Sequence, residues 1–383
     1  METLLAKHVP ELDGLRGIAI TSVIIHHQLA PISLSGGFLG VDLFFVLSGF
    51  LITSLLLAEF AQANRISLRN FYMRRLLRLG PALSLYLIAT FLVAYSTQSI
   101  SIVRQLKLIA VAVFYLTNWR MALGWDSALD PTAITWSLSI EEQFYLLWPL
   151  LLTVCLAVKL RRRFIAGGLA IVILGIAVHR YVLLEAGADL TRLYYGSDTR
   201  ADALLVGCIF GLLNAKMVQL RNKTRLLNTA ALVSALALGF LSFTSHFEDL
   251  FLYRGGFTAI AILCGVLIYA AANSPARALS ATLRFPPLMW LGHISYGLYL
   301  WHWLIVRNVS LYSLGRWEAT AKLGLSIGIA ATSFYVFEKP INRLKTRFTS
   351  RTMVPLVPPA TMSDNLPAHS APIAGAALTT SRN

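Results

Sequence analysis

The chain has 383 residues, of which 56% are hydrophobic and only 13% are charged; its mean hydropathy is +0.65. Soluble domains carry about a quarter charged residues, whereas apolar runs of about twenty residues, enough to cross a bilayer, recur here from end to end. The formal net charge of +15 could suggest nucleic-acid binding. The basic residues, however, form short clusters between apolar runs, as in the cytoplasmic loops of membrane proteins. The composition therefore predicts an all-α, polytopic transmembrane helical bundle and no nucleic-acid partner.

The apolar runs predict about ten membrane spans. Seven of them lie at about 15–33, 38–60, 81–95, 143–158, 164–184, 256–273 and 288–306. The sixth, seventh and tenth spans end at the basic segment 216–225, the acidic loop 246–249 and the Glu-Lys-Pro sequence at 338–340. Basic loops gather on the cytoplasmic side, and the segment 65–78 carries five arginines. We therefore predict that both termini are cytoplasmic.

The segment 100–119, the first span and the C-terminal segment each need a separate interpretation. The apolar segment 100–119 is expected to be interfacial or re-entrant, because a full crossing would place the basic cluster at 159–163 outside. The first span is expected to remain in the protein, since Glu11 and Asp13 precede it without a small-residue cleavage site. We predict a membrane domain at 1–348 and a disordered cytoplasmic tail at 349–383, which is rich in Pro, Ala, Ser and Thr.

The first span contains ionisable side chains, which are costly in a membrane and are by default candidate functional residues. Arg16 and His27 are eleven residues apart. On a helix this spacing puts them on one face, about 16 Å apart along the axis. His26 points away from that face, so we expect it to line only a helix contact or the interface. The alternative is a plain anchor with a snorkelling arginine and interfacial histidines.

A second group of ionisable residues falls in the outer half of the membrane or at its mouth. A histidine beside a carboxylate in a partly dry cavity can act as a general base, so these residues are candidates for the site, although the same pattern suits a proton-coupled transporter. The sequence does not say which carboxylate pairs with which histidine. For the adjacent carboxylates the alternative is a helix cap, and for the histidine of span nine it is a structural hydrogen bond. The group comprises Asp42, Glu141, Glu142, Asp198, Arg200, Asp202 and His302.

Arg75 and Arg78 lie after the second span, three residues apart and therefore on one helical face. Two guanidinium groups side by side can bind phosphate oxygens bidentately. The alternative is that they set the topology and meet anionic lipid head groups. The three cysteines lie in apolar spans without metal-ligand spacing, and we predict no metal site.

Seven motifs follow one another along most of the chain: LDGLRGIA with His27 after it, GFLGVDLFFVLSGFLI, RRLLRLGP, TWSLSIEEQFY, DTRADALLVG, ISYGLYLWHW and EKP. Together they resemble the acyltransferase-3 family of membrane O-acyltransferases. The resemblance implies transfer of an acyl group, commonly acetyl from acetyl-CoA, to a hydroxyl of an extracytoplasmic or lipid-linked glycan or a glycosylated metabolite. It also implies a place in the bacterial inner membrane. We expect no esterase-like domain of the kind fused to some members, which leaves open whether the chain acts alone.

The resemblance also implies roles for individual residues. His27 would be the catalytic histidine, activating the acceptor hydroxyl or carrying the acyl group. Arg16 would position the His27 region or the donor, and Glu141 would orient a histidine or the acceptor. Arg75 and Arg78 would bind the phosphates of acyl-CoA, which is a co-substrate rather than a bound cofactor. The alternatives are a transporter of a lipid-linked saccharide or proton-coupled solute, and an assembly partner in a polysaccharide export complex.

Overall fold

Helices joined by short loops and turns make up the computed structural model, which describes residues 8–29, 34–98, 100–125, 130–214, 224–273 and 276–348. No β-strand occurs in these ranges, so the predicted all-α class is confirmed. The described residues all belong to one unit, Met1–Met353. The predicted disordered tail, 349–383, lies outside the described residues, and the domain division stays a prediction.

Each long helix overlaps one of the predicted spans, although the helices that contain 81–95 and 143–158 begin earlier than predicted, at Leu68 and Trp136. They are α1 (Pro10–Leu29), α2 (Gly40–Ala63), α3 (Leu68–Thr97), α6 (Trp136–Ala157), α7 (Arg162–Glu185), α9 (Ser197–Asn214), α10 (Thr224–Thr244), α11 (Phe257–Asn273), α13 (Pro286–Asn308) and α14 (Glu318–Ser333). Shorter helices between or after them are α4 (Ile102–Val113), α5 (Thr117–Ala122), α8 (Leu190–Tyr195), α12 (Arg277–Leu283) and α15 (Lys339–Asn342).

Seven helical stretches of the described residues are long and apolar enough to cross a bilayer. They contain α2, α3, α6, α7, α10, α11 and α14. The remaining long helices, α1, α9 and α13, carry buried ionisable residues within their apolar sequences. A polytopic helical membrane bundle is therefore confirmed. The number of ten spans and the cytoplasmic position of the termini stay predictions.

The segment 100–119 forms two short helices rather than one span. Helix α4 has 12 residues and α5 has six, and Tyr115 between them has a positive φ of 54°. A helix needs about 20 residues to cross the hydrocarbon core. Neither helix is long enough, which agrees with the interfacial or re-entrant segment predicted here.

Two pairs of helices pack with their backbones in close contact, because glycines face each other's carbonyls. A Cβ atom on Gly292 of α13 would lie 1.9 Å from the carbonyl oxygen of Asp13 in α1. A Cβ on Gly207 of α9 would lie 2.2 Å from the carbonyl oxygen of Val46 in α2. Small residues allow such close approach between membrane helices. The polar side chains further along α1 and α13 are consequently brought within direct contact distance.

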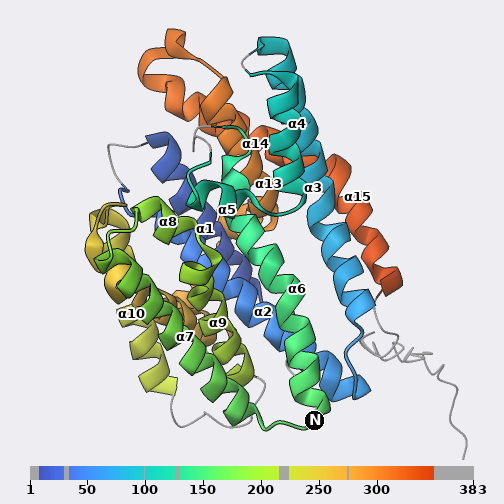
Figure 1. The fold of residues 1–383 in the computed structure, drawn as a ribbon, viewed down its shortest axis with the longest axis vertical. Helices are drawn as coiled ribbons and strands as arrows, with labels where there is room; N and C mark the ends of the chain where they lie inside the picture. Colours follow the sequence, from blue (N-terminus) through green and yellow to red (C-terminus); the bar gives the residue numbers. More distant parts are fainter. Residues whose placement is uncertain are drawn as a thin grey trace, which may run out of the picture. The chain divides into compact units, whose positions relative to one another are not determined.

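Helix α2 lies in the interior of the bundle and α10 at its periphery (Figure 1). In its most apolar stretch α2 is 78% buried, compared with 11% for α10. Exposed side chains such as Ile171 on α7 and Phe240 on α10 are apolar, as expected for a surface in contact with lipid tails. The ionisable residues of α1, α2 and α9 thus lie away from the apolar outer face.

Candidate active site

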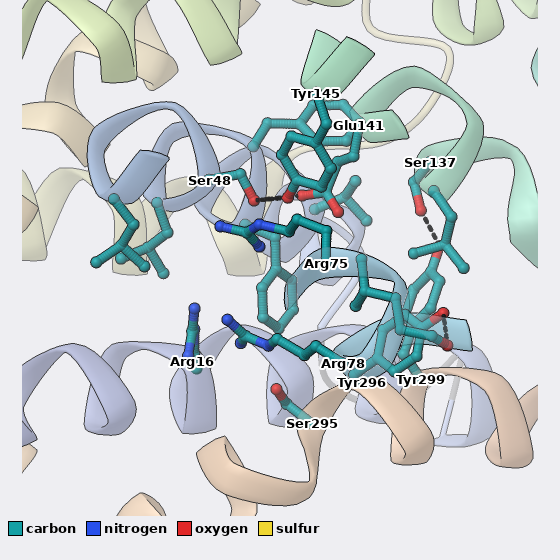
Figure 2. Close-up of a pocket in the computed structure, with 17 residues that line it drawn as sticks. Arg16, Ser48, Arg75, Arg78, Ser137, Glu141, Tyr145, Ser295, Tyr296 and Tyr299 are labelled. Carbon is teal, nitrogen blue, oxygen red and sulfur yellow. Dashed lines mark hydrogen bonds between the residues drawn. The ribbon is translucent and has the colours of Figure 1, made fainter. Parts of the chain in front are cut away.

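A cavity with three arginines, called the basic cavity below, lies between α1, α2, α3, α6 and α13. It encloses about 710 Å³, its mouth included. Arg16, Arg75 and Arg78 reach into the same space from two helices, and Glu141 of α6 faces them (Figure 2). The structure therefore brings together four of the residues predicted from the sequence.

The arginines of the basic cavity have little compensating charge. Arg16 Nη1 lies 3.8 Å from Asp13 Oδ1, at the long end of an ion pair. The guanidinium of Arg75 stacks on the ring of Tyr145, 4.8 Å from its centroid. Within the described ranges, no hydrogen-bond or ion-pair partner is found for the guanidinium groups of Arg75 and Arg78. Their donors are therefore available to an anionic ligand such as a phosphate.

Glu141 is held by hydroxyl groups rather than by an arginine. Ser48 Oγ donates to Glu141 Oε1 at 2.6 Å, and the Tyr145 hydroxyl donates to Ser48 Oγ at 2.9 Å. Figure 2 shows this chain of contacts above the guanidinium of Arg75. Glu141 and Asp13 together cannot balance the three guanidinium groups, so the cavity retains a positive charge that suits an anionic ligand.

A second cavity, called the histidine cavity below, encloses about 600 Å³. His26 and His27 of α1 both line it, whereas from the helical spacing we expected His26 to point away from the site. Tyr195 of α8 also lines it, and burial raises the pKa of its hydroxyl to about 12, so this group stays neutral near pH 7. The other aromatic lining residues are Phe38, Trp136, Tyr194, Phe247, Tyr299 and Trp303.

His27 and His302 are hydrogen-bonded to each other, and their partners determine which ring nitrogen of each histidine carries the hydrogen. His302 Nδ1 lies 3.0 Å from the carbonyl oxygen of Leu298, which can only accept, so His302 Nδ1 carries the hydrogen. In neutral His302, Nε2 is then an acceptor, and it lies 3.0 Å from His27 Nδ1. His27 must therefore donate through Nδ1, which leaves His27 Nε2 without a hydrogen. A bare imidazole nitrogen in a cavity can accept a proton or attack an electrophile.

The two cavities meet at Val41 and Tyr299, because both residues line both cavities. The Tyr299 hydroxyl and Ser137 Oγ lie 2.8 Å apart at this boundary. Arg16 and His27, predicted to share a face of one helix, each line one of the two cavities. Helix α1 thus runs from the arginines to the histidine pair without a break.

Other predicted site residues form ion pairs outside the linings of both cavities, although Arg200 lies over the ring of Tyr194, which lines the histidine cavity. Arg200 Nη2 donates to Asp42 Oδ1 at 2.8 Å, and Arg180 Nη1 donates to Asp202 Oδ2 at 3.0 Å. These four side chains are at most 1% exposed. They line neither cavity in the part of the chain that the structure describes. Their geometry is that of a buried link between α2, α7 and α9.

Asp198 and Glu142 also lie apart from the two cavities. Asp198 Oδ1 accepts from Arg192 Nη1 at 2.9 Å, and Asp198 Oδ2 lies 3.0 Å from His179 Nε2. Glu142 lines neither cavity among the described residues. Adjacent carboxylates in one helix point to different sides, and it is Glu141 that faces the basic cavity.

The expectation that a carboxylate would pair with the site histidine is wrong for His27. Its hydrogen-bond partner is His302, and Glu141 lies in the other cavity, where it accepts from Ser48. Ser48, Ser137 and Tyr299 also line the basic cavity, and none of them was predicted as a site residue from the sequence. Tyr299 belonged to a stripe of aromatic residues at spacings of three and four on span nine, which is the signal that could have indicated it.

Comparison with known proteins gives the family context of this site. The family Acyl_transf_3, described as an acyltransferase domain, matches residues 9–337. The putative peptidoglycan O-acetyltransferase YrhL of Bacillus subtilis is 36% identical over 363 residues, covering 90% of this chain and 56% of that protein. The peptidoglycan O-acetyltransferase OatA of Listeria monocytogenes is 39% identical over 360 residues, covering 88% and 56%.

A third relative carries a less specific name. The putative O-acetyltransferase SACOL0978 of Staphylococcus aureus is 35% identical over 359 residues, which cover 88% of this chain and 58% of that protein. The chain thus spans rather more than half the length of these relatives. No solved structure matches it.

Proposed function

Since the chain belongs to the acyltransferase-3 family of membrane acyltransferases, we propose that it is an O-acetyltransferase that acetylates a hydroxyl group of a glycan. The seven apolar helical stretches among the described residues and the bacterial relatives place it in a bacterial cell membrane as an integral protein. Two of the relatives named above are called peptidoglycan O-acetyltransferases, which makes peptidoglycan the first acceptor to test.

One observation carries this proposal. A cavity with three arginines and a cavity with a bare histidine nitrogen meet at Val41 and Tyr299. The first suits an anionic acyl donor and the second suits an acceptor hydroxyl. A group-transfer reaction needs a donor site and an acceptor site that adjoin, and these two cavities adjoin at Val41 and Tyr299.

The donor in this proposal is acyl-CoA, with acetyl-CoA as the first candidate. CoA carries several phosphates and cannot cross a bilayer, so a donor cavity must offer cations on the cytoplasmic side. Arg75 and Arg78 provide guanidinium groups without competing partners among the described residues, and Arg16 lies in the same cavity. Bidentate contacts to phosphate would hold the donor with its thioester directed toward Tyr299.

The reaction requires one proton to move. The acceptor oxygen attacks the acyl carbon while His27 Nε2 takes the hydroxyl proton, and the carbon–sulfur bond breaks. His27 then returns the proton to the thiolate, so the products are the glycan ester and CoA thiol. In a two-step version the same nitrogen attacks the thioester and displaces the CoA thiolate; the acceptor hydroxyl then takes the acyl group from the nitrogen, and its proton passes to the thiolate. In both versions the hydrogen bond to His302 keeps the hydrogen of neutral His27 on Nδ1, so that Nε2 is unprotonated when the reaction begins.

Mass spectrometry of glycans tests the proposal in the source bacterium. Strains would carry the intact gene, a deletion, His27→Ala, Arg75→Ala, or the control Arg163→Ala at an exposed position of α7. Loss of one acetyl mass from one glycan in the first three altered strains, but not in the control, is expected. Retention of every acetyl ester with loss of a whole glycan from the surface would instead favour a transporter.

A further inference from the structure

We propose that the Tyr299 hydroxyl donates a hydrogen bond to the acyl carbonyl oxygen during transfer, and so stabilises the negative charge that forms there. This inference rests on the proposed function, because it assumes that an acyl group is passed between the two cavities. It adds a role for Tyr299, which lies in the motif ISYGLYLWHW and to which the sequence alone assigned no role in the site. It also identifies the position of the reacting carbonyl, at the boundary of the two cavities.

The position of Tyr299 is the first reason for the proposal. Val41 and Tyr299 are the described residues that line both cavities, and only Tyr299 has a side-chain hydrogen-bond donor. A thioester bound through its phosphates in the basic cavity must present its carbonyl at this boundary to meet an acceptor in the histidine cavity. The tyrosine ring lies beside the histidine pair, with its centroid 5.8 Å from that of His302.

The hydrogen bonding of Tyr299 is the second reason. Its hydroxyl lies 2.8 Å from Ser137 Oγ, and a serine hydroxyl can donate to the phenol oxygen while the phenol proton stays available. Two other donors that line the cavities are occupied by backbone carbonyls. The Tyr296 hydroxyl donates to Leu79 at 3.1 Å, and Trp303 Nε1 donates to Asp130 at 3.2 Å.

The chemistry explains why a donor is needed there. When the acceptor oxygen or His27 Nε2 bonds to the acyl carbon, the carbonyl π electrons move onto the oxygen, which becomes an oxyanion. In a buried site a preorganised donor stabilises this oxyanion more strongly than the neutral carbonyl, and so lowers the barrier. Tyr299 is 5% exposed, so water competes little for the same hydrogen bond. As the oxyanion collapses, the carbon–sulfur bond breaks and the carbonyl forms again.

The test uses the purified full-length protein in lipid nanodiscs with acetyl-CoA and solubilised peptidoglycan strands, and it measures release of CoA thiol. Tyr299→Phe keeps the ring and removes only the hydroxyl. Its matched control is Tyr253→Phe, a buried tyrosine that lines neither cavity and whose hydroxyl donates to the Phe247 carbonyl at 3.0 Å. Ser137→Ala keeps the Tyr299 hydroxyl and removes its partner.

We expect Tyr299→Phe to lower kcat by about 10²-fold or more, with KM for acetyl-CoA changed by less than about threefold, because the hydrogen bond strengthens only in the transition state. Ser137→Ala should lower kcat by a smaller factor. A purely structural role would lower the thermal midpoint without this selective effect on kcat.

The two proposals fail in different ways. Equal kcat values for Tyr299→Phe and Tyr253→Phe, with an active unmodified protein, would overturn the assignment of Tyr299 alone. An unmodified protein that binds acetyl-CoA but releases no CoA with the strands would count against peptidoglycan as the acceptor. If no glycan acceptor at all supported release, the acyltransferase proposal and the role of Tyr299 would both be refuted.

Discussion

His27 Nδ1 lies 3.0 Å from His302 Nε2, although the two residues are 275 positions apart in the chain. The rings are nearly parallel, with centroids 5.2 Å apart and an interplanar angle of 13°. His302 in turn is anchored to the Leu298 carbonyl of its own helix. This relay gives His27 one defined tautomer and one defined orientation, which a single histidine on α1 would not have.

The first prediction concerns this pair. His302→Leu should lower kcat by about 10- to 100-fold, because His27 loses the acceptor for its Nδ1 hydrogen and can carry the hydrogen on Nε2 instead, where it would block the proposed base. His302→Gln should retain more activity, since its amide oxygen can still accept from His27 Nδ1. Single-turnover CoA release measures both. Equal loss in the two variants would show that the ring of His302, and not its acceptor, is what matters.

The second prediction concerns the basic cavity. Arg75→Ala and Arg78→Ala should each weaken acetyl-CoA binding by about tenfold, the effect of losing a charged hydrogen bond of roughly 1.5 kcal/mol. The exposed Arg163→Ala is the control for loss of one positive charge. Binding is measured by equilibrium dialysis with labelled CoA and repeated with dephospho-CoA. If the variants and the control bound CoA equally well, the arginine pair would be a topology or lipid contact.

The third prediction concerns the contact between α1 and α13. Gly292→Ala should destabilise the protein by about 1–3 kcal/mol, because the new methyl group would overlap the Asp13 carbonyl oxygen at 1.9 Å. Gly239→Ala on α10 is the control, since a Cβ there meets nothing within 4 Å. Thermal unfolding in detergent compares the two. A higher or unchanged midpoint for Gly292→Ala would contradict close packing of these helices.

The fourth prediction is that the buried ion pair of Asp42 and Arg200 contributes to stability and not to activity. Asp42→Asn leaves Arg200 buried beside a neutral partner and should destabilise the protein by about 3–5 kcal/mol. The activity of the molecules that remain folded should stay within about threefold of normal. Glu185→Gln removes an exposed partner of Arg254, where the side chains are 44% and 51% exposed, and should cost at most about 1 kcal/mol. A large loss of kcat in folded Asp42→Asn would place Asp42 in the site.

Local regularity explains what could be predicted from the sequence. The helical repeat relates residues of one helix, and so the arithmetic for Arg16 and His27 holds along the unbroken α1. The positive-inside pattern likewise predicted that the segment 100–119 is interfacial or re-entrant and does not cross the membrane. Residue spacing and the distribution of basic residues were sufficient for these two inferences, because neither depends on which helices are neighbours.

Contacts between helices distant in the chain could not be predicted in the same way. The partner of His27 depends on the close approach of α1 and α13 at Gly292, which no spacing within α1 reveals. The ion pair of Asp42 with Arg200 depends in the same way on the packing of α2 against α9. The sequence placed these residues near the membrane but could not assign their partners.

The side chains at the boundary, Val41 and Tyr299, also affect how easily ions could leak across the membrane through the protein. A bacterium stores energy as a proton gradient across this membrane, and a water-filled pore joining the two cavities would discharge it. Val41 and Tyr299 contribute an aliphatic side chain and an aromatic ring to the boundary, and an ion in contact with such groups would have to shed part of its hydration, which is costly in an apolar setting. An acetyl group is small and uncharged. On the proposed topology it would therefore cross this boundary at a lower desolvation cost than an ion.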